Sequence, residues 1–221
     1  DLKLHSCLVD GFIGGAIIAT KSTVDISQSD FKDNRAADYG GAIFAKQKSI
    51  IRMSNNVFIN NTASYGGALY SNNSTITINA SEFDSNNATT EGGALYYDGS
   101  NDITVNGSKF YGNTGNFGGA LFLSNSNTIT IEASEFDSNN AIINGGVLNS
   151  EGSNYITIDA SEFYGNTGSF GGAVFLLDGN IITIEASEFD SNNAIHSGGV
   201  LYSEGSNIII DASEFYGNTG S

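Results

Sequence analysis

The chain has no proline, no tryptophan and a single cysteine, Cys7, among its 221 residues. Without proline it is neither a proline-rich linker nor, despite its 28 glycines, a collagen-like chain. One cysteine forms no internal disulfide, so cysteine usage says little about the compartment. No apolar run is long enough to span a membrane, and no secretory signal pattern begins the chain, so we expect no direct membrane insertion.

Basic residues are also scarce. Eight Lys and Arg stand against 24 Asp and Glu, which gives a net charge of −16. The imbalance is uneven, because residues 53–221 contain one basic residue, Lys109, and 18 acidic ones. A chain of this charge is not expected to bind nucleic acid or an anionic membrane.

What the chain has in abundance is repetition. Gly-Gly pairs recur every 26 or 27 residues, beginning at Gly14, Gly40, Gly66, Gly92, Gly118, Gly145, Gly171 and Gly198. Phenylalanines keep the same period, at Phe31, Phe58, Phe83, Phe110, Phe136, Phe163, Phe189 and Phe215. Each is followed three residues later by an asparagine: Asn34, Asn61, Asn86, Asn113, Asn139, Asn166, Asn192 and Asn218. A fixed period of this length is the signature of a solenoid.

Each repeat contains three short runs typical of β-strands: Gly-Gly-Ala-Leu, an alternating run such as STITI, and Ser-x-Phe. We therefore predict an all-β fold, a right-handed single-stranded parallel β-helix of about eight coils of 26–27 residues, with three short strands per coil. Residues 1–221 are expected to form a single array, in which residues 1–20 are a degenerate first coil and 21–221 are regular. Because the chain starts without Met and both ends fall inside a repeat, we expect an excerpt of a longer repeat protein.

In such a fold, equivalent residues stack in columns about 4.8 Å apart. Isoleucines of the alternating run, such as Ile76 and Ile78, should point inward beside a stacked column of the eight phenylalanines. The eight asparagines should bond from amide to amide between coils. The glycines should allow a close approach that a Cβ would forbid.

The pairing of FxxN with GGA[ILV], as in FKDN–GGAI, FDSN–GGAL and FYGN–GGAL, covers nearly the whole chain. It resembles the passenger region of chlamydial polymorphic outer membrane proteins and related surface proteins. That resemblance implies a secreted β-helical adhesin on a cell surface, and hence an extracellular or cell-surface location.

Two outward columns are acidic, and their candidate metal ligands are Glu132, Glu135, Asp159, Glu162, Glu185, Glu188, Asp211 and Glu214. Stacked like charges repel, so they need screening or bridging. One interpretation is a row of Ca²⁺ sites built from oxygen ligands. The other is a solvated face that prevents aggregation.

A third column is aromatic: Phe44, Tyr70, Tyr96, Phe122, Phe175 and Tyr202, interrupted by Asn149. If it faces outward, it is a contact strip for a neighbouring filament or for sugar rings. If it faces inward, it is part of the core. The sequence leaves both open.

Sequons for N-glycosylation occur at Asn60, Asn72, Asn73, Asn79, Asn87 and Asn106. They would carry glycans only in a suitable host.

Catalytic chemistry has little basis, since the chain has only two histidines, His5 and His196, and two arginines, Arg35 and Arg52.

We therefore expect a non-enzymatic extracellular structural or adhesive β-helix, a component of a surface appendage or filament that polymerises end to end. The alternative is a monomeric adhesin passenger that binds a host receptor or glycan. The partner is then a second copy, a neighbouring surface protein or a glycan, and Ca²⁺ is the one cofactor considered. Two further alternatives are less favoured. One is a polysaccharide-active enzyme, and the other is an ice-binding protein, which the threonine column from Thr77 to Thr183 suggests.

Overall fold

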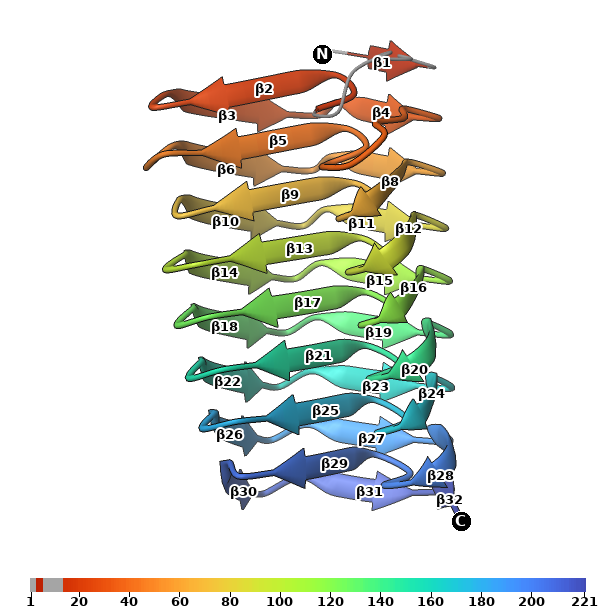
Figure 1. Ribbon diagram of the computed structural model, residues 1–221. Coiled ribbons are helices and arrows are strands. Elements are labelled where there is room, and N and C mark those ends of the chain that lie inside the picture. Colours follow the sequence, from red (N-terminus) through yellow and green to blue (C-terminus); the bar gives the residue numbers. More distant parts are fainter. Residues whose placement is uncertain (1–2, 6–13) are drawn as a thin grey trace.

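The computed structural model describes residues 3–5 and 14–221, and these parts contain strands and no helix. Much of the expected degenerate first coil, including Cys7, lies outside the described residues. Figure 1 shows the chain as a stack of similar coils, with its two ends at opposite ends of the stack. Every strand pair is parallel, so each coil bonds to the coil before it and the coil after it. The all-β parallel β-helix predicted from the repeat is confirmed.

Four parallel sheets, here named A to D, form the walls of the solenoid. Sheet A contains β1 (Lys3–His5), β4 (Asp30–Lys32), β7 (Val57–Ile59), β11 (Glu82–Asp84), β15 (Lys109–Tyr111), β19 (Glu135–Asp137), β23 (Glu162–Tyr164), β27 (Glu188–Asp190) and β31 (Glu214–Tyr216). Sheet B contains β8 (Thr62–Tyr65), β12 (Asn87–Glu91), β16 (Thr114–Phe117), β20 (Asn140–Asn144), β24 (Thr167–Phe170), β28 (Asn193–Ser197) and β32 (Thr219–Gly220).

Sheet C contains β2 (Ile17–Thr20), β5 (Ile43–Lys46), β9 (Leu69–Asn72), β13 (Leu95–Asp98), β17 (Leu121–Ser124), β21 (Leu148–Glu151), β25 (Val174–Leu177) and β29 (Leu201–Glu204). Sheet D contains β3 (Thr23–Ser27), β6 (Ile50–Ser54), β10 (Thr75–Asn79), β14 (Asp102–Asn106), β18 (Thr128–Glu132), β22 (Tyr155–Asp159), β26 (Ile181–Glu185) and β30 (Asn207–Asp211). Within a coil the chain runs through sheets C, D, A and B in that order.

Sheet B adds a fourth strand to every coil except the first, where three strands per coil were predicted. It lies between the Phe-x-x-Asn motif and the Gly-Gly pair, and its pairing is irregular, with register shifts between neighbours such as β12 and β16. Short polar segments such as TGNF bury one residue in four and show no regular alternation. The backbone extends there because the coil must close, which the local sequence does not reveal.

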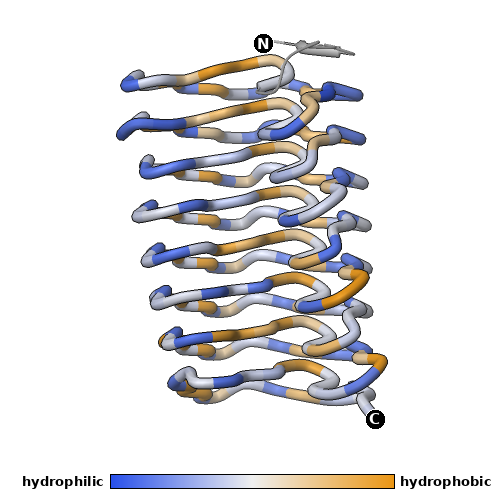
Figure 2. The backbone as a smooth tube through the Cα atoms, viewed as in Figure 1, coloured by the Kyte–Doolittle hydropathy of each residue, from blue (hydrophilic) through white to orange (hydrophobic). Residues whose placement is uncertain are grey.

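The core is a narrow column of aliphatic side chains and phenylalanines. Ile76 and Ile78 are fully buried, as predicted, and so are their equivalents in neighbouring coils. Figure 2 shows hydrophobic segments recurring at matching places from coil to coil, with hydrophilic ones at the turns. The phenylalanine rings stack with centroids 4.5–4.9 Å apart and planes within 12° of parallel. The predicted phenylalanine column is therefore confirmed.

The eight asparagines occupy the corner between sheets A and B, and their predicted amide-to-amide bonding is confirmed. Asn86 illustrates the pattern: its Nδ2 donates to the carbonyl oxygen of Phe58 in the preceding coil at 2.9 Å and to Oδ1 of Asn113 in the next coil at 3.0 Å. The backbone N–H of Asn86 donates to the same Oδ1. Each buried amide thus satisfies its donors and its acceptor, which a buried polar group requires.

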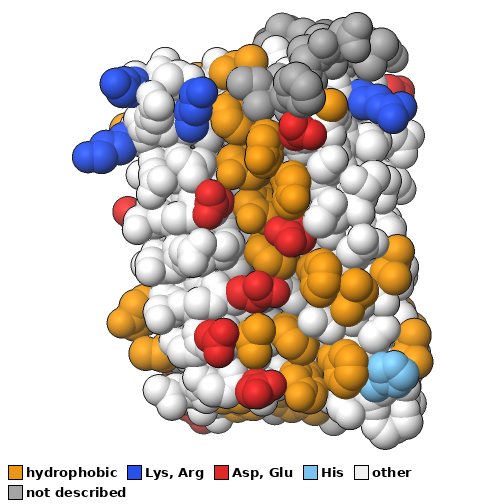
Figure 3. Space-filling model, in the orientation of Figure 1, with side chains coloured by type: hydrophobic (Ala, Val, Ile, Leu, Met, Phe, Trp, Pro, Cys, Tyr) orange, Lys and Arg blue, Asp and Glu red, His pale blue; other side chains and the backbone are white. Residues whose placement is uncertain are grey.

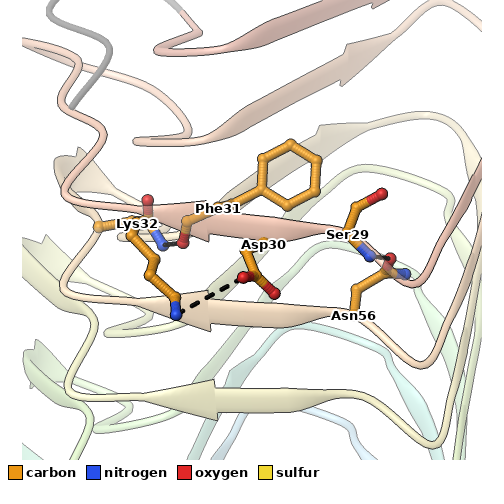
Figure 4. Close-up of polar contacts among 6 residues, drawn as sticks. Ser29, Asp30, Phe31, Lys32 and Asn56 are labelled. Carbon is orange, nitrogen blue, oxygen red and sulfur yellow. Dashed lines mark hydrogen bonds and ion pairs between the residues drawn. The ribbon is translucent and has the colours of Figure 1, made fainter. Parts of the chain in front are cut away.

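Two further polar columns were missed. At the corner between sheets C and D, Asn101, Asn127, Asn154 and Asn180 bond from amide to amide, and Ser49 and Ser74 continue the column. At the corner between sheets D and A, serine hydroxyls and Asn56 accept from the backbone of the preceding coil. Figure 4 shows this corner, where the N–H of Ser29 donates to Oδ1 of Asn56 at 3.0 Å.

Figure 4 also shows how one strand of sheet A divides its side chains between two sides. The ring of Phe31 lies on one side of β4 and is fully buried. Asp30 and Lys32 lie on the other side, and Lys32 Nζ is 3.6 Å from an oxygen of Asp30. The inner side of sheet A therefore builds the core, and its outer side carries charge.

The fourth corner, between sheets B and C, belongs to the Gly-Gly pairs. Gly66 has a φ of +65°, which favours glycine, and a Cβ at Gly67 would lie 2.1 Å from the carbonyl oxygen of Gly93 in the next coil. The backbone approach predicted for the glycines is confirmed. It lets the chain turn sharply from sheet B onto sheet C.

Candidate functional site

The outer face of sheet C carries the aromatic strip, defined as Phe44, Tyr70, Tyr96, Phe122, Phe175 and Tyr202. The strand neighbours of Phe44, Ile43 and Ala45, belong to the core cluster, whereas the strip residues do not. Since side chains alternate along a strand, the strip faces outward. Figure 3 shows it as a band of hydrophobic side chains along this face, interspersed with acidic ones. The sequence left open whether the strip faces outward or toward the core, and the strand geometry places it on the outward side.

The rings of the strip nevertheless expose little of their surface. Tyr70 stacks on Tyr96 with centroids 5.0 Å apart, and Tyr96 stacks on Phe122 at 5.1 Å. Phe122 is only 3% exposed and Phe175 only 7%. Because a neighbouring ring covers most of the ring faces, mainly ring edges and hydroxyl groups are available to a ligand. The strip is therefore no continuous platform for sugar rings.

A second row of residues covers the strip from the side. It consists of the residue that precedes each Gly-Gly pair, among them Tyr39, Tyr65, Glu91, Phe117, Asn144 and Phe170. The ring of Tyr39 lies 4.6 Å from that of Tyr70, and the ring of Tyr65 lies 5.5 Å from that of Tyr96. The sharp Gly-Gly corner folds this row over sheet C. Sequence reasoning missed the row, because its members share no residue type.

Carboxylates line the strip on both sides. Asp98 accepts hydrogen bonds from the hydroxyl of Tyr70 at 3.3 Å and from Nδ2 of Asn72 at 2.9 Å. Burial, followed by the charge of Glu151, raises the pKa of Glu91 above its ordinary value. Burial, followed by the charges of Glu91 and Asp98, raises the pKa of Tyr96, whose hydroxyl therefore stays protonated. This face combines aromatic edges with hydrogen-bond acceptors.

The strip is interrupted at Asn149, which is fully buried. Its Nδ2 donates to Oε1 of Glu151 at 3.1 Å. Its Oδ1 accepts no hydrogen bond, and neither does the buried Oδ1 of Asn144, five residues before it. Unpaired buried acceptors are uncommon in folded proteins. Both oxygens are buried, so neither is open to a ligand in this conformation.

The two acidic columns lie on other walls. Glu132, Asp159, Glu185 and Asp211 are adjacent in register at the end of the strands of sheet D. Glu135, Glu162, Glu188 and Glu214 are adjacent in register on sheet A. Lys109 Nζ lies 3.0 Å from a carboxylate oxygen of Glu135. Within residues 3–5 and 14–221 no group of three or more acidic, histidine or cysteine side chains is arranged to hold a metal ion. Calcium binding remains a prediction.

The sequons differ in how far they expose their asparagines. Asn60, Asn73, Asn79 and Asn106 are exposed, whereas Asn72 and Asn87 are half-buried. Asn79 and Asn106 are register partners in neighbouring strands of sheet D. These positions fall in the same column as the acidic residues from Glu132 onward. Glycosylation itself remains a prediction.

The family of the chain follows from its sequence match. The chain matches the family described as "Right handed beta helix region" over residues 3–170. Neither a curated protein nor a solved structure matches the chain. The resemblance to chlamydial surface proteins remains a prediction. In the described part of the chain no helix is long and apolar enough to cross a bilayer. The match confirms the predicted handedness, and the chain belongs to the right-handed β-helix family.

Proposed function

We propose that this chain is a non-catalytic adhesive rod of an extracellular surface, and that it binds its partner through the outer face of sheet C. The observation that carries this proposal is the combination found on that face: a stacked aromatic strip beside carboxylates such as Glu151 and Glu204, which no lysine or arginine of the chain pairs with among the described residues. Aromatic edges and free acceptors on a rigid wall are suited to binding.

A stiff scaffold supports the same proposal. Four sheets and three buried polar columns link every coil to the next, so the strip residues hold fixed positions along the rod. A preorganised face loses little conformational entropy when a partner binds. The acidic side chains of sheets A and D recur from coil to coil in the same arrangement. Such repetition builds a surface and gives no reason to assign one reacting centre.

The test compares the two kinds of face on arrays of glycans and of peptides. One variant carries Tyr70→Asn, Tyr96→Asn and Tyr202→Asn, which repeats on sheet C the residue that the chain already has at Asn149. The control carries Glu135→Gln, Glu162→Gln and Glu188→Gln on sheet A. We expect the sheet C variant to lose about tenfold or more in binding and the control to keep it. Equal losses in the two variants would contradict the proposal.

The second candidate is a filament that grows by stacking coil on coil. It is favoured by the periodicity of the contacts between coils: the asparagine amides and the phenylalanine rings meet in the same way at every step. Negative-stain electron microscopy with and without EDTA separates the candidates. Short single rods support the adhesive rod, whereas long fibres support the filament, and fibres that dissolve in EDTA would indicate calcium bridges.

A further inference from the structure

A small hollow of about 240 Å³ lies on the outer face of sheet C, where β20 and β24 approach β25 and β29. Its lining residues are Ile143, Asn144, Phe170, Phe175, Tyr202 and Glu204. The rings of Phe175 and Tyr202 are parallel to within 4° and stack at 5.3 Å. Phe170 stands at 65° to Tyr202, with centroids 5.4 Å apart. The three rings therefore form the two walls of an aromatic corner.

The polar groups at this corner are acceptors. Oδ1 of Asn144 is buried and accepts no hydrogen bond. Glu204 is exposed, and its carboxylate forms no salt bridge within the described parts of the chain. A ligand that pairs with Glu204 must donate hydrogen bonds, and a positive charge would also match its carboxylate.

The same corner occurs earlier in the chain, where the protein fills it itself. Tyr70 and Tyr96 stack at 5.0 Å, and Tyr65 stands at 73° to Tyr96. There the carboxylate is Asp98, and it accepts from the hydroxyl of Tyr70 and from Nδ2 of Asn72.

At the later corner both donors are missing. Register pairing places Phe175 beside Tyr202 and Leu177 beside Glu204, so Phe175 stands where Tyr70 stands and Leu177 where Asn72 stands. Neither phenylalanine nor leucine carries a side-chain donor. In the middle copy, Nδ2 of Asn149 donates to Glu151. Asp98 and Glu151 thus each accept a hydrogen bond from a side chain. Among the described residues, no side chain donates a hydrogen bond to the carboxylate of Glu204.

No lysine or arginine of the described residues pairs with Glu204. After Arg52 the chain has one Lys or Arg, Lys109, which pairs with Glu135 on sheet A at 3.0 Å, and one histidine, His196, whose ring centroid lies 5.1 Å from that of Phe170. A lysine or arginine partner for Glu204 would therefore come from another molecule. The net charge of −16 also attracts cations toward the molecule.

We propose that this corner binds the ammonium group of a lysine side chain from a partner protein. The ammonium donates to the carboxylate of Glu204, and the aliphatic part of the lysine packs against Phe170, Phe175 and Tyr202, whose rings favour a nearby cation. The proposal rests on the proposed adhesive function and names the chemistry that the sheet C face recognises.

The test is a titration of the whole chain with the peptide acetyl-Gly-Lys-Gly-amide, followed by NMR of the aromatic carbons and protons. Signals of Tyr202 are assigned from a Tyr202→Phe variant. We expect saturable shifts of Phe170, Phe175 and Tyr202 with a dissociation constant on the order of 1 mM, because a single side chain makes few contacts. The same peptide with acetylated lysine should give no shift. Equal shifts from the acetylated peptide would overturn the proposal.

Two matched variants separate this site from general attraction to an acidic protein. Glu204→Gln should weaken lysine binding about tenfold, whereas Glu188→Gln, which removes the same charge from sheet A, should leave it unchanged. Equal weakening by the two variants would overturn the proposal. An arginine peptide that binds as tightly as the lysine peptide would also overturn the assignment to an ammonium group.

The failure of this site is distinguishable from failure of the adhesive function. If lysine does not bind but the sheet C variant still loses array binding, the ammonium site is wrong and the adhesive face stands. If lysine binds with the expected specificity but array binding is unaffected by the sheet C variant, the ammonium site stands and the adhesive function is wrong.

Discussion

Asn86 and Asn113 lie in neighbouring coils, and the side-chain amide of Asn86 donates a hydrogen bond of 3.0 Å to the side-chain oxygen of Asn113. The amide of Asn113 in turn donates to Asn139 and to the carbonyl oxygen of Phe83, each at 2.9 Å. From Asn61 to Asn218 every amide in this column is both donor and acceptor. The column therefore selects the amide group itself and not merely a polar side chain.

Replacing Asn113 by aspartate tests this requirement. The carboxylate keeps the acceptor but loses both donors, and it faces the oxygens of Phe83 and Asn139 in a buried site. We expect the free energy of unfolding in urea to fall by roughly 3–5 kcal/mol. The control Asn140→Asp adds the same charge at an exposed position and should change stability by less than about 0.5 kcal/mol. Similar losses in the two variants would contradict the role assigned to the column.

The Gly-Gly corner makes a second prediction. In Gly119→Ala the new Cβ would lie 2.1 Å from the carbonyl oxygen of Gly146, so the two coils must separate. We expect a loss of more than about 3 kcal/mol in the free energy of unfolding. At Gly107 nothing lies within 4 Å and the strain comes only from a φ of +55°, so Gly107→Ala should cost about 1 kcal/mol. Urea denaturation compares them, and equal costs would contradict the close approach.

Glu91 gives a prediction about pH. Burial raises its pKa in the folded chain above the unfolded value, so the charged carboxylate destabilises the fold at neutral pH. Glu91→Gln should therefore raise the melting temperature at pH 7. The gain should shrink as the pH falls through the folded pKa and vanish below the unfolded value near 4.5, where both states are protonated. Glu188→Gln, at an exposed site, is the control, and a gain at Glu91 that does not change with pH would refute this explanation.

The acidic columns predict a dependence on salt. Glu185 and Glu188 stand next to like charges in neighbouring coils, so raising NaCl from about 0.01 M to 0.15 M should raise the melting temperature. The double variant Glu185→Gln/Glu188→Gln should respond less steeply. A melting temperature that does not depend on salt would contradict the repulsion. CaCl₂ and MgCl₂ at equal ionic strength then decide the calcium question, because only specific sites would favour calcium.

The sequence predicted those parts of the fold in which one residue type repeats. The phenylalanine column, the asparagine column and the Gly-Gly corner each need one kind of side chain at every coil, so their period is visible in the letters. The Ser/Asn columns at the other corners were missed because Ser74 and Asn101 both accept from a backbone N–H, which allows the residue types to mix.

The candidate site was less accessible to sequence reasoning. The sequence shows the aromatic strip as a periodic pattern. Whether its rings point outward or inward depends on which of two alternating sets of residues in sheet C packs against the core. The row that covers it, from Tyr39 to Phe170, contains aromatic, acidic and amide residues and follows only from the angle of the glycine corner. Glu204 lacks a side-chain hydrogen-bond donor because Leu177 is its register partner in the preceding coil. A sequence alone does not supply that register.

Adhesion of coated beads to cultured cells under flow measures binding by the outer face of sheet C. Beads carry the chain, its Tyr70→Asn/Tyr96→Asn/Tyr202→Asn variant, or the Glu135→Gln/Glu162→Gln/Glu188→Gln variant. We expect the native and the glutamine-substituted chains to hold beads on cells, and the asparagine-substituted chain, still folded by circular dichroism, not to hold them. Equal adhesion by all three, or adhesion no greater than that of uncoated beads, would contradict it.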